Sequence, residues 1–566
     1  MNTIKTWATL LSCALVLLLP VSSHADDDDK ASKRFQPRVL KDTNPQKDVV
    51  EVVLTAREGN VSYINGVSTK VYTYNGIVPG PMIKAKVGDT LIVHFYNQLP
   101  EETTVHWHGL ELPANMDGSS IAQNPVQPGG YFRYEFKLLR AATYWYHPHI
   151  RGNEQVELGL HGTLVVRDKK QDKALGIPKK STVLVLDDVL LDDNFNVADP
   201  LPTDPLARAE MIVNGREGNT LLVNGKVNPI KNVRNGKPQR LRIVNTSNSR
   251  FMRVSIPGHQ LHRIGGDGGL LETPITLDPI GQVMMGGGHG GGMMMTISDP
   301  DITKGLILTP GERADVIFTP KGKKGDELAL EWHDIARGRH TASYRADGTI
   351  ALGHYHMDGM QAPVTMMRFK LKGKGKHKRK NFSLPSSLRD ITTIDATGAG
   401  KIPVMFGHGQ PDAQGNVTFF AAMKDGKPLP FPKVTAADAV TVAPNETRVI
   451  EVVNMTGGIH NYHLHGFMFQ HIETQYVDMD NPANNYTVPA THLEDKDTIL
   501  VPGRPGAMMR SRTIVRLAVK FDDTGREGQI AASGKTPTDT ESGGWLMHCH
   551  ILEHADSGMT SFVQVQ

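Results

Sequence analysis

Cysteine is nearly absent from this chain of 566 residues, which contains only Cys13 and Cys549. Cys13 lies within the first 25 residues, where Lys5 precedes an apolar run and Ala25 ends a segment typical of a secretory signal peptide. Once that segment is removed, Cys549 is the sole cysteine and no disulfide within the chain can form. A lone thiol outside the cytosol is open to oxidation, and a metal that holds it as a thiolate would remove that liability.

Long hydrophobic runs and a strong excess of one charge are also missing. The apolar run of the signal, Leu10 to Leu19, is too short to cross a bilayer, so we expect no membrane span. A net charge of +3 gives no reason to expect nucleic acid as a partner. We therefore expect an exported monomer, periplasmic or secreted. The Asp26–Lys30 run after the signal is either a protease-cleavage insert or a native charged N-terminus, and the sequence leaves both open.

Strong helical patterns are scarce as well, whereas glycine and proline separate short runs rich in Val, Ile, Thr and Tyr. This pattern predicts an all-β protein with Greek-key turns. The clearer predicted strands are Val49–Ala56, Lys70–Tyr74, Thr90–Asn97, Gly130–Lys137, Ser181–Asp187, Gln239–Asn245, Arg448–Asn454 and Thr513–Phe521. The runs group into three consecutive β-barrel or sandwich domains, which we place at residues 46–170, 178–370 and 390–566.

Histidines, in contrast, are concentrated in four short clusters. These are His106-Trp107-His108, His147-Pro148-His149, His460 with His463-Leu464-His465, and His548-Cys549-His550 with His554. On a strand, both histidines of a His-x-His pair face the same side, which suits capture of one metal ion or of two adjacent ions. One such pair is weak evidence for a site, but four in one exported β protein are hard to ascribe to chance.

The last cluster contains two kinds of ligand on one strand. His548 and His550 should point to one side and Cys549 to the other. A cysteine, two histidines and a weak axial methionine form the ligand set of a blue copper centre, so Cys549 would be joined by His554, Met559 and a histidine from elsewhere. The alternative is a buried cysteine among surface histidines.

Taken together, the four motifs in this order resemble those of the three-domain bacterial multicopper oxidases, which include laccases, bilirubin oxidases and cuprous oxidases. The resemblance covers essentially the whole mature chain and implies three cupredoxin-like domains and four copper ions. It assigns the type 1 copper to Cys549, His460, His554 and Met559. It assigns the type 2 copper to His106 and His463, and the type 3 pair to His108, His147, His149, His465, His548 and His550.

The implied reaction is one-electron oxidation of a substrate at the type 1 copper, coupled to reduction of dioxygen to water at the other three. Asp117 matches an acidic residue that relatives place near the three-copper cluster, where a carboxylate can deliver protons. It could also be a turn aspartate before glycine. Relatives often have glutamate directly after the last type 1 histidine, where this chain has Ala555, so the second proton donor is left open between Glu553 and Asp556.

The substrate is less clearly indicated. Phenols or aromatic amines are the leading expectation, and Cu(I) is the alternative because thioethers favour it. The glycine-rich segment 281–296, which we expect to be a loop, holds Met284, Met285, Met293, Met294 and Met295. Those methionines could relay Cu(I) or merely pack on a surface. Asp497 matches a region where relatives place a substrate-contacting acid. A non-catalytic copper-binding scaffold is the third hypothesis, disfavoured because all twelve expected ligands are present.

Overall fold

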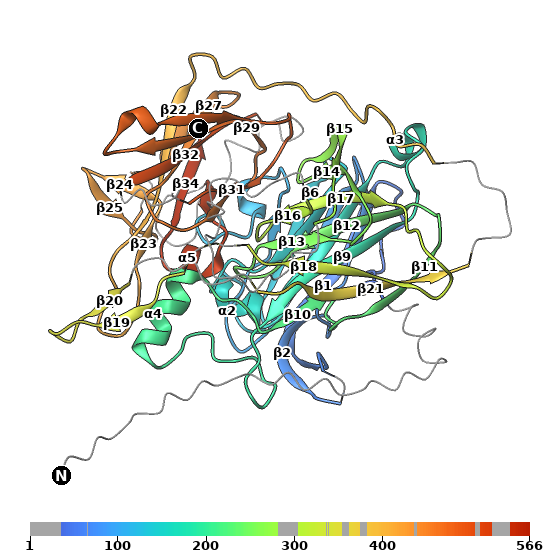
Figure 1. Ribbon diagram of the computed structural model, residues 1–566, viewed down its shortest axis with the longest axis horizontal. Coiled ribbons are helices and arrows are strands. Elements are labelled where there is room, and N and C mark those ends of the chain that lie inside the picture. Colours follow the sequence, from blue (N-terminus) through green and yellow to red (C-terminus); the bar gives the residue numbers. More distant parts are fainter. Residues whose placement is uncertain are drawn as a thin grey trace, which may run out of the picture.

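The computed structural model describes residues 35–64, 66–280, 304–335, 337, 339–353, 361–373, 382–434, 438–503, 510–522 and 544–566. The predicted signal peptide, the Asp26–Lys30 run and the segment 281–296 with its five methionines therefore lie outside the described residues. Strands dominate the rest (Figure 1), which confirms the all-β prediction. No helix in the described part of the chain is both long and apolar enough to span a bilayer.

The strands fall into three units that follow one another along the chain. The first unit comprises β1 (Val49–Val61), β2 (Thr69–Tyr74), β3 (Ile83–Lys86), β4 (Thr90–Gln98), β5 (His106–His108), β6 (Tyr131–Lys137), β7 (Thr143–His147) and β8 (Gly162–Arg167). The second comprises β9 (Ser181–Val189), β10 (Thr220–Val223), β11 (Ile230–Arg234), β12 (Gln239–Asn245), β13 (Met252–Ser255), β14 (Leu261–Gly266), β15 (Gly269–Leu277), β16 (Leu306–Leu308), β17 (Arg313–Phe318), β18 (Glu327–His333), β19 (Ala342–Tyr344), β20 (Ile350–Leu352) and β21 (Val364–Lys372).

The third unit comprises β22 (Gly400–His408), β23 (Phe419–Phe420), β24 (Ala422–Lys424), β25 (Lys427–Leu429), β26 (Val440–Val442), β27 (Thr447–Asn454), β28 (His460–Leu464), β29 (Phe469–Asp478), β30 (Tyr486–Pro489), β31 (Thr498–Val501), β32 (Ser511–Lys520), β33 (Trp545–Cys549) and β34 (Thr560–Val565). All eight predicted strands coincide with observed ones to within a few residues at each end, and β12 has the predicted bounds.

The three units repeat one topology. In the first sheet of each, an initial strand pairs in parallel with a second, which pairs antiparallel with a third: β1, β4 and β6, then β9, β12 and β17, then β22, β27 and β32. The second sheets also correspond, with strand orders β3-β8-β7-β5, β11-β21-β18-β13-β16 and β26-β34-β33-β28-β31. The strand pairs β5–β7, β13–β18 and β28–β33 therefore occupy equivalent positions.

The core of each unit lies between two open sheets, so of the two predicted arrangements, barrel or sandwich, the structure has the sandwich. The second and third units each carry a further two-stranded sheet, β19–β20 and β24–β25. Consecutive strands such as β2 and β3 belong to different sheets, and the hydrogen-bonded ladder does not continue around the unit. The apolar core lies between the sheets: in the first unit Leu54 of β1 and Leu164 of β8 belong to one buried cluster. This is the Greek-key sandwich arrangement, in which the inner faces of two sheets form the core.

The helices of the described residues are short and lie at the connections. They are the 3-10 turns η1 (Ala114–Met116) and η3 (Pro482–Asn484), and the helices α2 (Gly152–Glu157), α3 (Lys169–Ala174), α4 (Pro205–Asn214) and α5 (Leu552–Asp556). The sequence analysis missed α4, although Asp204 caps it by accepting a hydrogen bond from the Ala207 amide and a proline follows at its first position. Helix α5 follows β33 closely and carries one of the expected copper ligands.

Candidate metal centre

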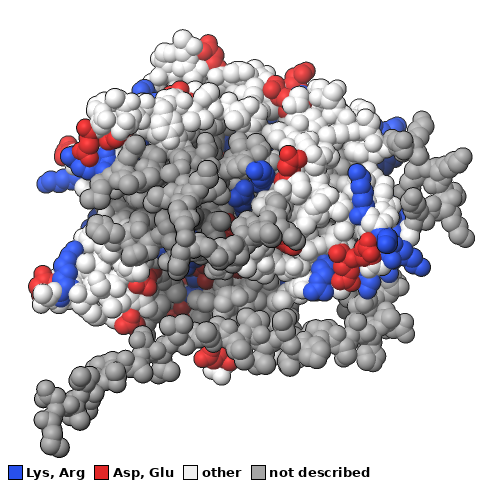
Figure 2. Space-filling view, in the orientation of Figure 1, with Lys and Arg blue, Asp and Glu red and all other residues white. Residues whose placement is uncertain are grey.

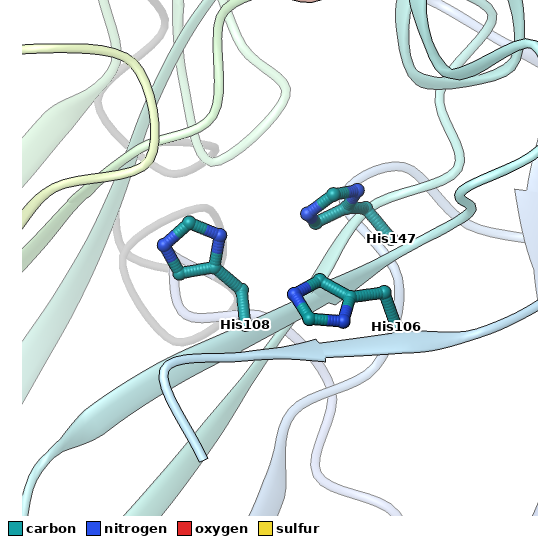
Figure 3. Close-up of side chains that lie close together, drawn as sticks. All are labelled: His106, His108 and His147. Atoms are coloured by element: carbon teal, nitrogen blue, oxygen red, sulfur yellow. The ribbon is translucent and has the colours of Figure 1, made fainter. Parts of the chain in front are cut away.

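The strand pair β5–β7 brings three histidines of the first unit together. His106 lies opposite His147 in the antiparallel ladder, and His108 is two residues further along β5. The three buried rings turn toward a common space (Figure 3), with 5.2 Å between the ring centroids of His106 and His147. One nitrogen of each ring lies within 4.8 Å of the others. Three imidazole nitrogens at this spacing can share one metal ion or hold neighbouring ions.

The equivalent strand pair of the third unit, β28–β33, supplies the facing histidines. His463 lies opposite His548, and His465 follows the end of β28. The ring of His465 stacks on His106 at 3.9 Å, and the ring of His463 stacks on His108 at 3.8 Å. Two His-x-His motifs from opposite ends of the chain thus meet ring to ring.

Two further rings complete the group. His149 meets His465 and His548 edge to face, with centroids 4.9 and 5.2 Å apart. His550 lies 4.9 Å from His108. What we call the eight-histidine cluster consists of His106, His108, His147, His149, His463, His465, His548 and His550.

Asp117 links the stacked pair of His106 and His465. Its main-chain oxygen accepts a hydrogen bond from His106 Nδ1 at 2.8 Å, and its carboxylate Oδ2 accepts one from His465 Nδ1 at 2.7 Å. A carbonyl oxygen can only accept, so Nδ1 of His106 carries the proton and Nε2 keeps its lone pair. The side chain of Asp117 is fully buried. It therefore fixes the orientation of two rings at once.

Asp497 links the other stacked pair in the same way. Its main-chain oxygen accepts from His463 Nδ1 at 2.8 Å, and its Oδ1 accepts from His108 Nε2 at 3.1 Å. The predicted contact of Asp497 with a substrate is therefore wrong, because the carboxylate is fully buried against the eight-histidine cluster. The reason is the sheet: Asp497 directly precedes β31, which pairs with β28 and so brings the aspartate beside His463.

The donor set of this cluster fits metal ions. Within the described residues, several buried ring nitrogens have no hydrogen-bond partner: Nε2 of His106, His147 and His463, Nδ1 of His108, and both nitrogens of His550. A buried polar atom without a partner costs about 1–3 kcal/mol. Burial also lowers the pKa of the His108, His147 and His550 rings, so they are neutral and able to donate a lone pair. Metal ions would satisfy these atoms.

A second cluster lies on the other side of β33. The Cys549 Sγ is 3.6 Å from Nδ1 of His460 on β28 and 3.6 Å from Nδ1 of His554 on α5. The two Nδ1 atoms are 3.1 Å apart, so three ligand atoms converge. Burial raises the pKa of the Cys549 thiol to about 12 and lowers the pKa of His460 to about 3. A thiolate at this position therefore requires a bound cation, which is the role of copper in a cysteine–histidine site.

Backbone hydrogen bonds close this second cluster. The Cys549 amide donates to the Met559 carbonyl at 3.1 Å, and the Met559 amide donates to the His554 carbonyl at 2.9 Å. Met559 is fully buried. Asn461, which the sequence analysis missed, accepts a hydrogen bond from the His550 amide at 3.0 Å through Oδ1. Its position next to His460 was the one feature of the sequence that could have indicated a role in the site.

The second unit contributes Arg313, a further residue that the sequence analysis missed. Its guanidinium forms two hydrogen bonds to the Asp497 carboxylate, at 2.6 and 2.5 Å, and donates through Nε to the Thr143 carbonyl at 3.0 Å. Arg313 is fully buried and lies on β17, Thr143 opens β7, and Asp497 belongs to the third unit. One side chain therefore ties all three units together beside the eight-histidine cluster.

Ala555, the residue directly after His554, is buried on α5. The two neighbouring acids have other partners. Glu553 is buried and accepts from Asn248 Nδ2 at 2.9 Å, while Asp556 accepts from the Asn153 amide at 2.7 Å. Both acids thus bond groups outside the eight-histidine cluster.

Comparisons with known proteins agree with this geometry. Family models described as multicopper oxidase match residues 55–171, 181–286 and 401–566. The chain is 26% identical over 539 residues to a multicopper oxidase of Staphylococcus aureus, covering 94% of this chain and 91% of that protein. It is 25% identical to a laccase of Bacillus subtilis, covering 87% and 89%.

The structure is also similar to that of a multicopper oxidase from Campylobacter jejuni described as a metallo-oxidase, with a TM-score of 0.67, 25% identity and 94% of both chains covered. The fold, the two histidine clusters and the three matched segments point to one family, whose members hold four copper ions and use dioxygen to oxidise a reducing substrate. The chain belongs to the multicopper oxidases and is an oxidoreductase.

Proposed function

We propose that this protein is a laccase-like multicopper oxidase that takes single electrons from phenols or aromatic amines. Cys549, His460, His554 and Met559 would hold the type 1 copper, and the eight-histidine cluster would hold the other three ions. Within that cluster, His106 and His463 are assigned to type 2 copper and the remaining six histidines to the type 3 pair. The bound coppers would supply the redox chemistry, accepting substrate electrons at one site and passing them to dioxygen at the other.

The chain itself supplies the connection between the two sites. Cys549 is joined by peptide bonds to His548 and His550, so a continuous covalent path leads from one cluster to the other. Asn461 stiffens this path by accepting from the His550 amide. Reduction of dioxygen also consumes protons, and Asp117 can hold one at Oδ1, a buried oxygen that accepts no hydrogen bond within the described residues.

A narrow pocket of about 10 Å³, room for about one water molecule, lies beside the type 1 ligands, and the residues at its mouth favour an aromatic substrate. The pocket is lined by Val213, Asn214, Arg337, His340, His408, Phe419, Thr456, Gly458, Ile459, His460, Ile551 and His554. Its ionisable side chains, as far as the described residues show them, are one arginine and histidines. Among the described residues this lining includes no carboxylate or thioether that would attract a copper ion, and the Phe419 ring, stacked on His554 at 4.3 Å, offers an apolar surface to an aromatic substrate.

Cu(I) oxidation is the second candidate. Five methionines at residues 284–295 and the description of the Campylobacter jejuni relative as a metallo-oxidase favour it. The two candidates predict different responses to the loss of that segment. We further propose export to the periplasm or medium, a monomeric state, and domains at residues 46–170, 178–370 and 390–566.

Steady-state oxidation of a methoxyphenol and of Cu(I) by the copper-loaded enzyme tests the proposal. His408→Gln removes an imidazole from the pocket wall, and His262→Gln, on β14 of the second unit, is the matched control. We expect His408→Gln to lower kcat/KM for the phenol several-fold and His262→Gln to leave it unchanged.

Deletion of residues 284–295 separates the candidates. Phenol oxidation that persists while Cu(I) oxidation is lost assigns the segment to Cu(I) and makes Cu(I) the second substrate. An enzyme that oxidises Cu(I) readily and the phenol not at all contradicts the laccase-like proposal.

A further inference from the structure

A basic groove lies between the first and second units, away from both histidine clusters. It is open on one side, has a volume of about 670 Å³, and is bordered by β3, β8, the start of β9, β11 and the turn between β11 and β12. The charged side chains that line it are all basic: Lys84, Arg167, Lys179, Lys180, Lys231 and Lys237. This volume is in the range of small-molecule sites, which span roughly 300–1,000 Å³.

The walls of the groove are held by side chains. Gln36 Nε2 donates to the Ser181 carbonyl at 3.3 Å, and Arg167 Nη2 donates to the Lys179 carbonyl at 2.6 Å. On the opposite wall, Gln239 Nε2 donates to the Lys237 carbonyl at 2.8 Å. The first two bonds join the segment before β1 and the end of β8 to the link between the first two units, and the third holds the turn before β12. A ligand would therefore meet a largely formed site, which lowers the entropy cost of binding.

The positive charges in the groove are crowded and incompletely neutralised. Within the described residues, Lys84 and Lys231 form no ion pair with a carboxylate, and Lys231 lies over the Phe35 ring at 5.1 Å. Arg167 reaches Asp172 at 3.3 Å, an ion pair that offsets the charge of Arg167 and not those of Lys84 and Lys231. Burial, together with the charge of Arg167, lowers the pKa of Lys84, and burial lowers the pKa of Lys231. An anion bound in the groove would stabilise the charged form of both lysines.

We propose that this groove binds a small anion that carries a chain of phosphates. Lysine ammonium groups are compact point charges with three donors each, and they suit phosphate oxygens from several directions. The hydroxyl groups of Ser181 and Thr182 in the lining can supply further donors. The volume favours a molecule of the size of tripolyphosphate or a nucleotide over a polymer. This inference rests on the groove alone and does not depend on the copper assignments.

Calorimetric titration of the copper-loaded, full-length protein with inorganic tripolyphosphate tests the proposal. We expect one saturable site per chain. Combined Lys84→Gln, Lys180→Gln and Lys231→Gln should weaken binding at least about ten-fold, because three opposing charges are removed from the groove. The matched control is Lys137→Gln, Lys433→Gln and Lys520→Gln, which changes the net charge equally at exposed sites elsewhere and should change affinity less than about two-fold.

Further ligands identify what the groove recognises. If ATP binds as tightly as tripolyphosphate and AMP binds much more weakly, the groove recognises a phosphate chain and the ligand is a nucleotide. If only tripolyphosphate binds, the ligand is an inorganic polyphosphate. Citrate binding equally well would overturn the phosphate class. No saturable binding, or equal loss in both triple variants, would overturn the site itself. Unchanged blue absorption during titration shows that the ligand does not withdraw copper, and equal phenol oxidation by both variants shows that they fold.

Discussion

The strand pairs β5–β7 and β28–β33 can be compared with β13–β18, which occupies the same place in the second unit. The first two pairs set His106 opposite His147 and His463 opposite His548. The third sets Arg253 opposite His333. Three strand pairs of the same topology thus differ in their side chains: two carry facing histidines, and the third pairs an arginine with a histidine. The function therefore lies in the residues placed on the strands and not in the fold.

His333, the histidine on this strand pair of the second unit, has a hydrogen-bond partner within its own unit. His333 Nε2 lies 3.0 Å from the Ser255 hydroxyl, whereas Nε2 of the equivalent His147 has no hydrogen-bond partner among the described residues. The second unit nevertheless contributes to the site, because Arg313 on its other sheet holds the Asp497 carboxylate beside the eight-histidine cluster. Residues that would bind copper, such as His147, are therefore distinct from residues that position them, such as Arg313.

Replacing Cys549 with serine should have the largest effect. The weakly donating hydroxyl cannot replace the thiolate, so we expect loss of the blue absorption and a fall in phenol oxidation of at least about a thousand-fold. Metal analysis should still find copper in the eight-histidine cluster. Loss of all copper would show that the two clusters do not form independently.

Asp117→Asn should come next. An amide keeps the hydrogen bond to the His465 ring only by adapting its orientation and cannot carry the proton, so kcat should fall about a hundred-fold, within the range for a general acid. Visible and paramagnetic resonance spectra should show the copper ions still present. Normal turnover in this variant would leave Asp117 with an orienting role alone.

Arg313→Met tests the contribution of the second unit. It leaves the Asp497 carboxylate buried without its partner, which should cost about 3–5 kcal/mol of unfolding free energy. We also expect altered type 2 copper resonance, since Asp497 orients His108 and His463. Arg313→Lys restores the charge and should recover part of the stability. A normal resonance spectrum in the methionine variant would mean that Arg313 acts on stability only.

Removal of copper should make stability depend on pH in a defined direction. Burial lowers the pKa of His460 to about 3 and that of the His108 and His147 rings well below the usual value. The unfolded chain takes up protons below about pH 6.5, while these folded rings do not. The metal-free protein should therefore lose stability progressively as pH falls below about 6.5. Denaturant titrations that show constant stability from pH 7 to 5 would contradict the buried neutral histidines.

His333→Gln should have the smallest effect. It removes a histidine from the equivalent strand of the second unit and weakens one hydrogen bond, at a cost of about 1 kcal/mol. Copper content and phenol turnover should stay within about two-fold of the unsubstituted enzyme. A lost copper ion would show that the second unit does bind metal and would break the comparison.

Much of the candidate site was predictable because short motifs on strands encode local geometry. The alternation of side chains at the end of β33 separates Cys549 from His548 and from His550, which follows the strand, and it can be read from the sequence. The position of Asp497 could not be read, because it depends on which strand β31 pairs with, and Arg313 lies 184 residues away from the carboxylate it holds. Open sheets rather than closed barrels likewise depend on long-range pairing that local patterns do not specify.

X-ray diffraction at the copper absorption edge, on crystals of the copper-loaded protein, tests the central claim most directly. The account predicts one anomalous peak among Cys549, His460 and His554 and three within the eight-histidine cluster, with none at His333. Fewer than three peaks in the eight-histidine cluster, or a peak on the β13–β18 pair, would contradict it.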